Sequence, residues 1–139
     1  MSKNYIGRAP SQVQFPDFAT QAEMEAAAAV DKMVSPGQQK FHPGTAKAWA
    51  NFSTLGGVLT IKSMYGISGI VRTGVGQCTV TFAAPFANVD YVPLGTGASV
   101  LCDFVVSGKL AASCQVRSVF ASTGAFQEGE VAWIFFGDQ

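Results

Sequence analysis

The side chains that could carry out acid–base or nucleophilic chemistry are few in this chain of 139 residues. His42 is the only histidine, and it lies between Phe41 and Pro43. A hydrolytic triad needs a histidine beside a nucleophile and an acid, and the chain has no G-x-S-x-G motif to supply the nucleophile. We therefore expect His42 to be a hinge or capping residue rather than a catalytic base.

Carboxylate pairs are a second arrangement to consider, because two carboxylates roughly 5–10 Å apart can hydrolyse a glycosidic bond. Glu128 and Glu130 flank a glycine at an expected strand edge, where charge mainly discourages pairing with another strand. Asp103 lies within an apolar segment, where we expect it to pair with Arg72 or Arg117. These patterns favour structural roles, and we expect no enzymatic activity.

The cysteine and glycine patterns also argue against a metal or a cofactor. Cys78, Cys102 and Cys114 are odd in number and lack a C-x-x-C motif, so we expect them to be reduced core residues. One histidine and scattered cysteines do not build a zinc site. No helix is expected after the glycine turn at 74–76, as a dinucleotide-binding loop would require. We expect no cofactor, and the sequence leaves open whether Cys78 and Cys102 pair across strands.

The balance of charge and hydrophobicity narrows the classes of partner. Nine basic and nine acidic residues cancel, and 13% of residues are charged against 48% that are hydrophobic. A neutral chain lacks the basic surface that nucleic-acid binding needs. No apolar run approaches the roughly 20 residues of a membrane helix, so we expect no membrane insertion. A surface this poor in charge favours burial in a homo-oligomer.

Residues 1–19 show neither helical nor strand periodicity, and two prolines remove backbone donors from them. The segment nevertheless carries more apolar side chains than a solvated tail needs. We predict that residues 1–43 form an N-terminal docking arm that lies against another surface, with a flexible tail as the alternative. The expected docking residues are Tyr5, Ile6, Arg8, Val13, Phe15 and Phe18.

Residues 20–34 are expected to form the one α-helix. Thr20 and Glu23 have the spacing of a capping box, and Ser35 followed by proline and glycine should end the helix. A helix of about 15 residues is marginal alone in water, so it needs a partner for its alanine-rich stripe. The expected contacts between copies on that stripe are Met24, Ala27 and Ala28.

From residue 44 onward, glycine-containing turns recur about every ten residues. This spacing predicts an antiparallel β-sandwich or barrel domain over residues 44–139. The fold class is therefore mainly β, with the domain preceded by an extended arm and one short helix. The expected strands are 46–53, 57–65, 67–72, 76–83, 88–94, 98–107, 111–121 and 129–136.

Aromatic residues of this domain are candidates for contacts with other molecules. The last strand is apolar on both faces, although a sandwich has only one interior. We therefore expect Trp133 and Phe135 to contact another copy of the chain, with packing in the core as the alternative for Trp133. Tyr65 and Tyr91 lie beside turns, and we expect them to be exposed and available to a receptor, either a host surface glycan or a protein.

One pattern runs from AWANF at 48–52, through a glycine-rich turn, to GVGQCTVTF at 74–82 and NVDY at 88–91. With this pattern, residues 42–95 resemble the terminal module of many tailed-phage fibre proteins. Cys78 stands where an aromatic residue is usual, so packing is expected to differ there. The resemblance implies a homotrimer on the virion surface, assembled in the host cytoplasm, with capsid or tail proteins as further partners.

Two hypotheses are compatible with this resemblance. The chain has neither heptads nor shaft repeats between arm and domain, which favours a squat capsid decoration or cement protein, or a very short fibre. The likeness to a tip favours a tail-fibre tip that binds a host receptor on a shaft made by another chain. A lectin-like binding domain outside any virion is the remaining alternative.

Overall fold

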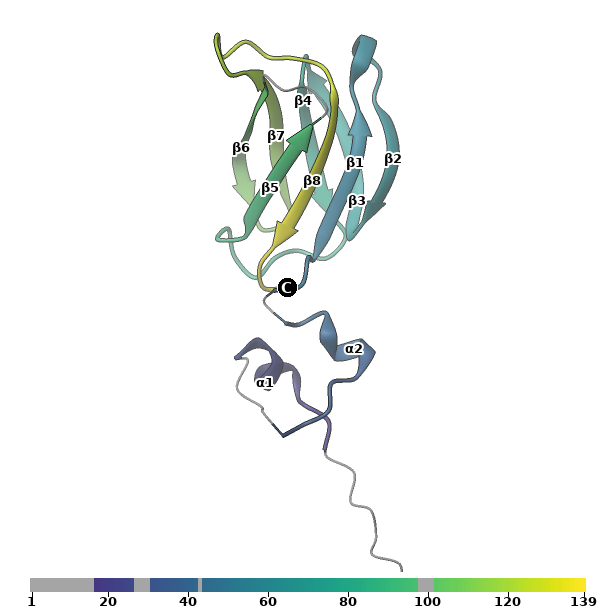
Figure 1. Cartoon of the computed structure of the whole chain (residues 1–139), viewed down its shortest axis with the longest axis vertical. Helices are drawn as coiled ribbons and strands as arrows, with labels where there is room; N and C mark the ends of the chain where they lie inside the picture. Colours follow the sequence, from purple (N-terminus) through teal and green to yellow (C-terminus); the bar gives the residue numbers. More distant parts are fainter. Residues whose placement is uncertain (1–16, 27–30, 43, 98–101) are drawn as a thin grey trace, which may run out of the picture.

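The computed structural model describes residues 17–26, 31–42, 44–97 and 102–139. Two antiparallel four-stranded sheets pack face to face, and a short N-terminal region lies at one end of them (Figure 1). The first sheet has the strand order β2-β1-β8-β5 and the second the order β3-β4-β7-β6. The strands are β1 (Ala48–Ser53), β2 (Thr60–Tyr65), β3 (Ile67–Gly74), β4 (Gln77–Phe82), β5 (Val92–Gly97), β6 (Cys102–Leu110), β7 (Ser113–Phe120) and β8 (Glu130–Phe136).

The predicted mainly β fold is confirmed, and each of the eight expected strands overlaps one that is observed. The start of β5 differs clearly, because it begins at Val92 rather than at residue 88. The Asn88 side chain accepts a hydrogen bond from the Asp90 N–H at 2.8 Å. The asparagine side chain stabilises a local turn of the backbone, so the strand begins only after this turn.

Period-2 alternation places the core between the sheets. In β4, Cys78, Val80 and Phe82 are buried, whereas the intervening glutamine and threonines are not. In β1, the inward positions include Ala50 and Phe52. Because successive side chains of a strand point to opposite faces, the same alternation decides which residues lie on the outside.

Aromatic rings fill the part of the core nearest the C-terminus. The Phe82 ring lies edge-on to three others, with centroid distances of 4.8 Å to Phe86, 5.4 Å to Tyr91 and 5.0 Å to Phe135. Edge-to-face pairs at these distances stabilise a core beyond the area that they bury. The segment between β4 and β5 is therefore held to the sandwich by its own aromatic residues.

The N-terminal region holds two short helices, α1 (Gln21–Glu25) and α2 (Pro36–Gln39), rather than the single long helix that the sequence predicts. The capping box is confirmed: the Thr20 hydroxyl accepts a hydrogen bond from the Glu23 N–H at 3.3 Å, and the Glu23 carboxylate accepts one from the Thr20 N–H at 2.8 Å. Pro36 begins a helix instead of ending one, because its missing N–H costs no hydrogen bond at the first helical position. Among the described residues, no helix has the length and apolar character needed to cross a membrane.

Backbone contacts of Met33 explain why the long helix is wrong. The Met33 N–H donates to the Asp17 carbonyl at 3.0 Å, and the Ala19 N–H donates to the Met33 carbonyl at 2.8 Å. Lys32 adds an ion pair with Glu23 at 2.7 Å. These contacts take the backbone groups that a continuing helix would use, and an alanine-rich helix of about 15 residues is too marginal to compete.

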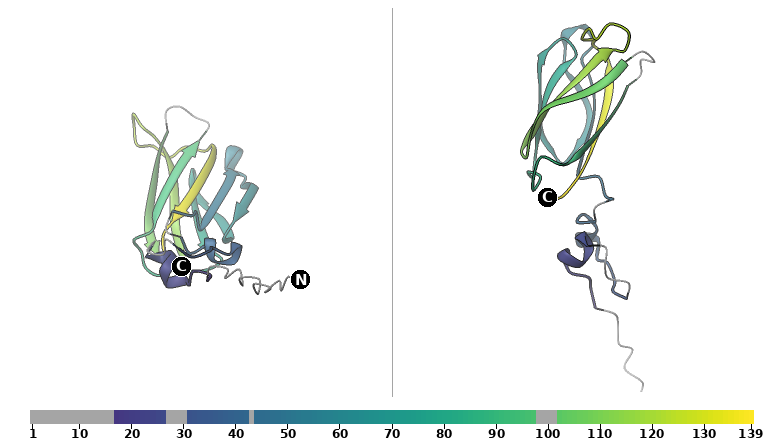
Figure 2. Two further views of the ribbon diagram at one scale, coloured as in Figure 1. Left: turned by 60° about the horizontal axis from the view of Figure 1, so that its bottom comes forward. Right: turned by 90° about the vertical axis from the view of Figure 1, so that its left-hand side faces the viewer.

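The two ends of the sandwich differ. The connections at residues 54–59, 75–76 and 121–129 lie together at one end, which we call the loop end. The N-terminal region and the C-terminus lie at the opposite end, which we call the arm end (Figure 1). Figure 2 shows the same polarity from two further directions, with the sheets as separate layers.

Candidate functional site

His42 lies exposed where the N-terminal region joins the sandwich. The ring Nδ1 of His42 accepts a hydrogen bond from the Gly44 N–H at 3.1 Å. The backbone N–H of His42 donates to the Gln39 carbonyl at 3.1 Å. The imidazole therefore closes the turn that leads toward β1. This position agrees with the expected hinge or capping role.

Lys47 fixes the direction in which the N-terminal region leaves the sandwich. The side chain is buried, and its Nζ donates to the carbonyls of Lys40 and His42, the second at 3.2 Å. Burial lowers the pKa of this ammonium group. The Lys47 N–H donates to the Phe135 carbonyl at 2.9 Å. One residue thus ties the end of α2 to the last strand.

Glu128 forms part of an ion pair near the loop end. Its carboxylate accepts hydrogen bonds from Arg72 Nη2 and, at 2.8 Å, from the Gly57 N–H. These two bonds, that from Arg72 foremost, lower the pKa of Glu128. The expected pairing of Asp103 with Arg72 or Arg117 is wrong. Asp103 is exposed, and no ion pair among the described residues includes it.

Acid should therefore destabilise the fold partly through Glu128. Its pKa is lowered in the folded chain, so the stabilisation is complete above the unfolded pKa and is lost as the pH falls through the folded value. We expect the melting temperature of Glu128→Gln to fall less than that of the wild type between about pH 6 and about pH 3. Arg72→Gln removes the same bond from its other side and should reduce the pH dependence in the same direction. An unchanged pH dependence in both variants would contradict the assignment.

Glu130 forms an ion pair with Lys62. The pair spans β1, because β2 carries the lysine and β8 carries the glutamate. The expectation that residues 128–130 mark a strand edge is wrong, since β8 is a central strand paired with both β1 and β5.

Cys78 and Cys114 are buried free thiols. Burial raises the pKa of each to about 11, which makes them poor nucleophiles. Cys78 does not pair with Cys102, because β7 separates the strands that carry the two residues. In the described ranges, no three residues of the types His, Cys, Asp and Glu come together as a metal site.

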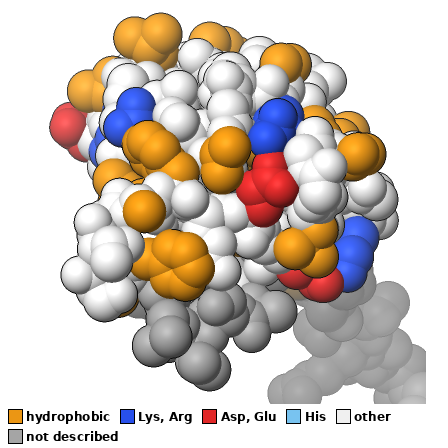
Figure 3. Space-filling view, turned by 90° about the horizontal axis from the view of Figure 1, so that it is seen from above, with side chains coloured by type: hydrophobic (Ala, Val, Ile, Leu, Met, Phe, Trp, Pro, Cys, Tyr) orange, Lys and Arg blue, Asp and Glu red, His pale blue; other side chains and the backbone are white. Residues whose placement is uncertain are grey.

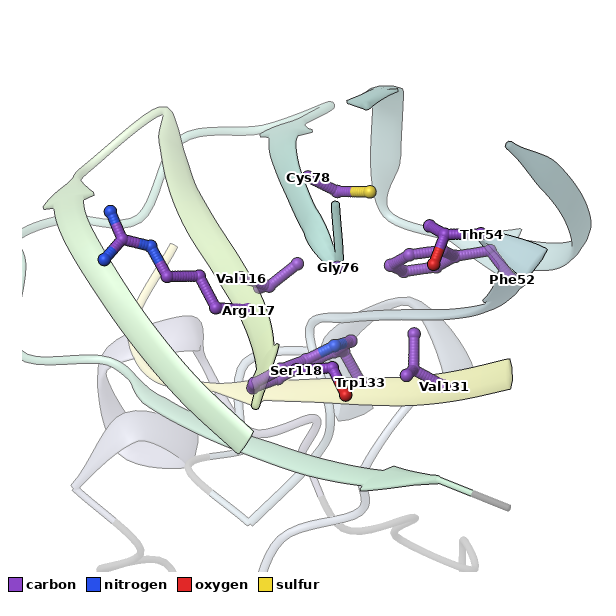
Figure 4. Close-up of a pocket in the computed structure, with 9 residues that line it drawn as sticks. All are labelled: Phe52, Thr54, Gly76, Cys78, Val116, Arg117, Ser118, Val131 and Trp133. Atoms are coloured by element: carbon purple, nitrogen blue, oxygen red, sulfur yellow. The ribbon is translucent and has the colours of Figure 1, made fainter. Parts of the chain in front are cut away.

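A small cavity lies between the sheets toward the loop end (Figure 4). Its volume is about 10 Å³, and Phe52, Val116 and Trp133 line it together with Thr54 and Ser118. A space of this size holds at most one water molecule. It is too small for a small-molecule substrate.

Four of the predicted contact residues lie in the interior of the chain. Trp133 and Phe135 are only 2% and 0% exposed, and they belong to the core between the sheets. Tyr91 is also buried, and its hydroxyl donates to the Ser113 carbonyl at 3.3 Å. Met24 is buried in the N-terminal region. The expectations that Tyr91 is exposed and that the other three contact another copy are therefore wrong.

The remaining predicted residues divide into two groups. Tyr65 and Phe18 are exposed, as a contact residue must be. Whether either binds another molecule stays a prediction. The others lie outside the described residues, namely Tyr5, Ile6, Arg8, Val13, Phe15, Ala27 and Ala28.

An exposed apolar row crosses the outer face of the β2-β1-β8-β5 sheet. Tyr65 is paired with Trp49, Trp49 with Ile134, and Ile134 with Leu94. These four side chains, which we call the apolar row, are between 38% and 56% exposed. The Trp49 and Tyr65 rings stack at 6.4 Å between centroids. Residues directly opposite each other share a face, so the row is continuous across all four strands.

Sequence reasoning missed this row, although a signal for it was present. Ala48, Ala50 and Phe52 alternate as inward residues, which leaves Trp49 on the outside. In β8 the sequence predicts that Trp133 and Phe135 point outward. The structure shows the opposite, because Ile134 points outward and its two neighbours point inward. A shift of one position exchanges every inward side chain for an outward one.

The outer face of the second sheet is polar by comparison. Its rows pair Thr79 with Gln115 and Gln115 with Ser107. Arg117 lies opposite Gln77 on the same face, and the Arg117 guanidinium donates to the Gln115 amide oxygen. The two outer faces are therefore chemically different, and among the residues that the structure describes only the first carries an apolar row across all of its strands.

The loop end presents separate apolar groups. Leu55 and Val58 are exposed on the connection between β1 and β2, Val75 on the turn after β3, and Phe126 on the connection before β8. Figure 3 looks onto this end and shows hydrophobic side chains in several groups among polar atoms. This surface is a second candidate for contact with another molecule.

Comparisons of this chain with protein-family models, with curated proteins and with solved structures gave no match.

Proposed function

We propose that this chain is a non-enzymatic structural protein of a tailed-phage virion. It is a squat homotrimeric decoration, cement or short-fibre protein that docks to the particle through its N-terminal arm. The observation that carries the proposal is the separation of the arm end from the loop end. We infer that the chain attaches by the arm end and presents the loop end to solvent. The pattern at residues 42–95, which resembles phage fibre tips, supports the virion as its location.

The junction between arm and sandwich supports a squat particle-bound protein rather than a long fibre. Lys47 is hydrogen-bonded both to the end of α2 and to β8, so the N-terminal region lies directly against the sandwich. No shaft separates the two parts along the described residues 31–42 and 44–48. The sandwich is therefore joined directly to the described part of the arm.

Removing residues 1–16 should abolish attachment to the particle. The expected docking side chains Tyr5, Ile6, Arg8, Val13 and Phe15 lie in that segment, whereas the core residues of the described sandwich lie between positions 48 and 135. The full chain and the shortened chain are mixed with particles that lack the protein and sedimented together. We expect the full chain to sediment with the particles and the shortened chain to remain in solution. Equal sedimentation of both would contradict docking through the arm.

The second candidate function is that of a tail-fibre tip that binds a host receptor during adsorption. The observation that favours it is the exposure of Leu55, Val58 and Val75 at the end farthest from the arm. Particles without the protein separate the two functions. Decoration predicts particles that break more readily on heating, whereas receptor binding predicts stable particles that do not adsorb to the host.

A further inference from the structure

The apolar row leaves one question about the homotrimer, namely which surface joins the copies. We propose that a second copy of this chain covers the row, so that the outer face of the β2-β1-β8-β5 sheet is the contact between subunits. Val92 and Phe136 extend the same face beside the row. The inference rests on the proposed function, because it names the surface that holds that homotrimer together.

The edges of this sheet are poor places for a second copy. An exposed edge strand can pair with another chain through its free backbone groups, and proteins block such pairing with lysine or proline. The edge strand β2 carries Lys62, and the edge strand β5 carries Pro93, which has no N–H to donate. Copies therefore meet through side chains of the face rather than through a continued sheet.

The charges on this face permit it to be covered. The four strands contain only two charged residues, Lys62 and Glu130, and these form an ion pair with each other. A buried charge without a partner is strongly destabilising. Because the face is neutral and internally paired, a copy of itself covers it without burying an unpaired charge. A charged partner would find no complementary group there.

The direction of the row determines how the copies are arranged. The row runs across the strands, so rotation about an axis parallel to the strands brings each row to the level of the same row in the next copy. The polar residues Ser63, Asn51 and Thr96, on the same face, then meet at their own level. All arm ends lie together in such an assembly, as docking to one particle requires. An antiparallel pair would place the arms at opposite ends.

The size of the face sets the expected strength of the contact. Four strands about 4.8 Å apart and six residues of about 3.3 Å each give a flat area of roughly 400 Å². A standard stable interface buries about 800 Å² on each partner. The face therefore offers about half of that area, and charges placed on a contact of this size should separate the copies.

The test compares molar mass by light scattering over a series of concentrations for three forms of the full chain. The first is the wild type, the second Tyr65→Lys combined with Leu94→Lys, and the third Val71→Lys. Val71 is exposed on an edge strand of the other sheet and serves as the matched control. We expect trimers of the wild type and the control. The double variant should associate about 100-fold more weakly or worse, because it buries unpaired charges.

Thermal melting checks that all three forms are folded, which is expected because the substituted side chains are exposed. A folded double variant with the wild-type mass would overturn the inference, and so would a wild type that is monomeric at every concentration. A trimeric double variant that no longer adsorbs to host cells would assign the face to a host partner instead. Sedimentation with particles is scored separately, so virion attachment can fail while this contact holds, or the reverse.

Discussion

Replacing Phe135 with alanine is expected to lower the free energy of unfolding by about 3–5 kcal/mol. The side chain is 0% exposed, and its ring lies 5.0 Å from that of Phe82 and 6.4 Å from that of Trp133 between centroids. The substitution removes this ring from the centre of the aromatic cluster and leaves a cavity. A loss of that size is a large part of the roughly 5–15 kcal/mol that stabilises an ordinary domain. Unfolding in urea measures it.

Phe126→Ala is the matched control, because it makes the same chemical change at an exposed position near the loop end. We expect it to cost about 1 kcal/mol or less, as surface substitutions do. The comparison also decides the role of β8. If Phe135→Ala unfolded like the wild type but had a smaller molar mass, Phe135 would be a contact between copies, as the sequence predicts, and the core assignment would be wrong.

Replacing Gly76 with alanine is expected to cost about 3 kcal/mol or more, through strain and overlap together. Gly76 has a φ of +58°, and an added Cβ would lie 2.2 Å from the Gln127 carbonyl oxygen and 2.8 Å from the Ser118 carbonyl oxygen. Its own carbonyl accepts a hydrogen bond from the Ser118 N–H at 2.9 Å. These are backbone atoms, so neither can move aside without breaking the pairing beside β7.

Gly124→Ala separates the backbone strain from the steric overlap. Gly124 has nearly the same φ, +67°, but an added Cβ there would meet no atom within 4 Å. Only the conformational penalty remains, and we expect a loss of about 1 kcal/mol. Melting temperatures of the two variants measure the difference. Equal losses would show that close approach at Gly76 contributes nothing to stability.

The β-domain could be predicted from the sequence because its signals are local. Glycines such as Gly66 and Gly76 mark turns with positive φ, and the alternation in β4 places Val80 and Phe82 inside. The segment 131–136 was harder, because every residue in it is apolar and alternation then gives no direction. Its inward face is decided by contacts with Phe82 and other residues distant in the sequence.

The N-terminal region could not be predicted in the same way. Thr20 and Glu23 form the capping box that their spacing indicates. The end of the helix, however, depends on Met33 pairing with the backbone of residues 17 and 19, and no local sequence pattern indicates this contact. Weak helical sequences follow their long-range contacts, because their intrinsic preference is small.

The candidate contact surface could also be predicted only in part from the sequence. The exposure of Tyr65 beside a turn was predicted, and it is confirmed. Its position in a row with Trp49, Ile134 and Leu94 required the register of four strands, which come from distant parts of the chain. Single residues could be nominated from the sequence, whereas the surface that they form depends on the sheet order.

As proposed above, this chain is a structural component of a phage particle. Quantitative mass spectrometry of gradient-purified virions from the source of the gene tests it most directly. We predict that the chain is present in the particles, with a copy number divisible by three and in constant ratio to the other virion proteins. Absence of the chain from intact, infectious particles would contradict the claim.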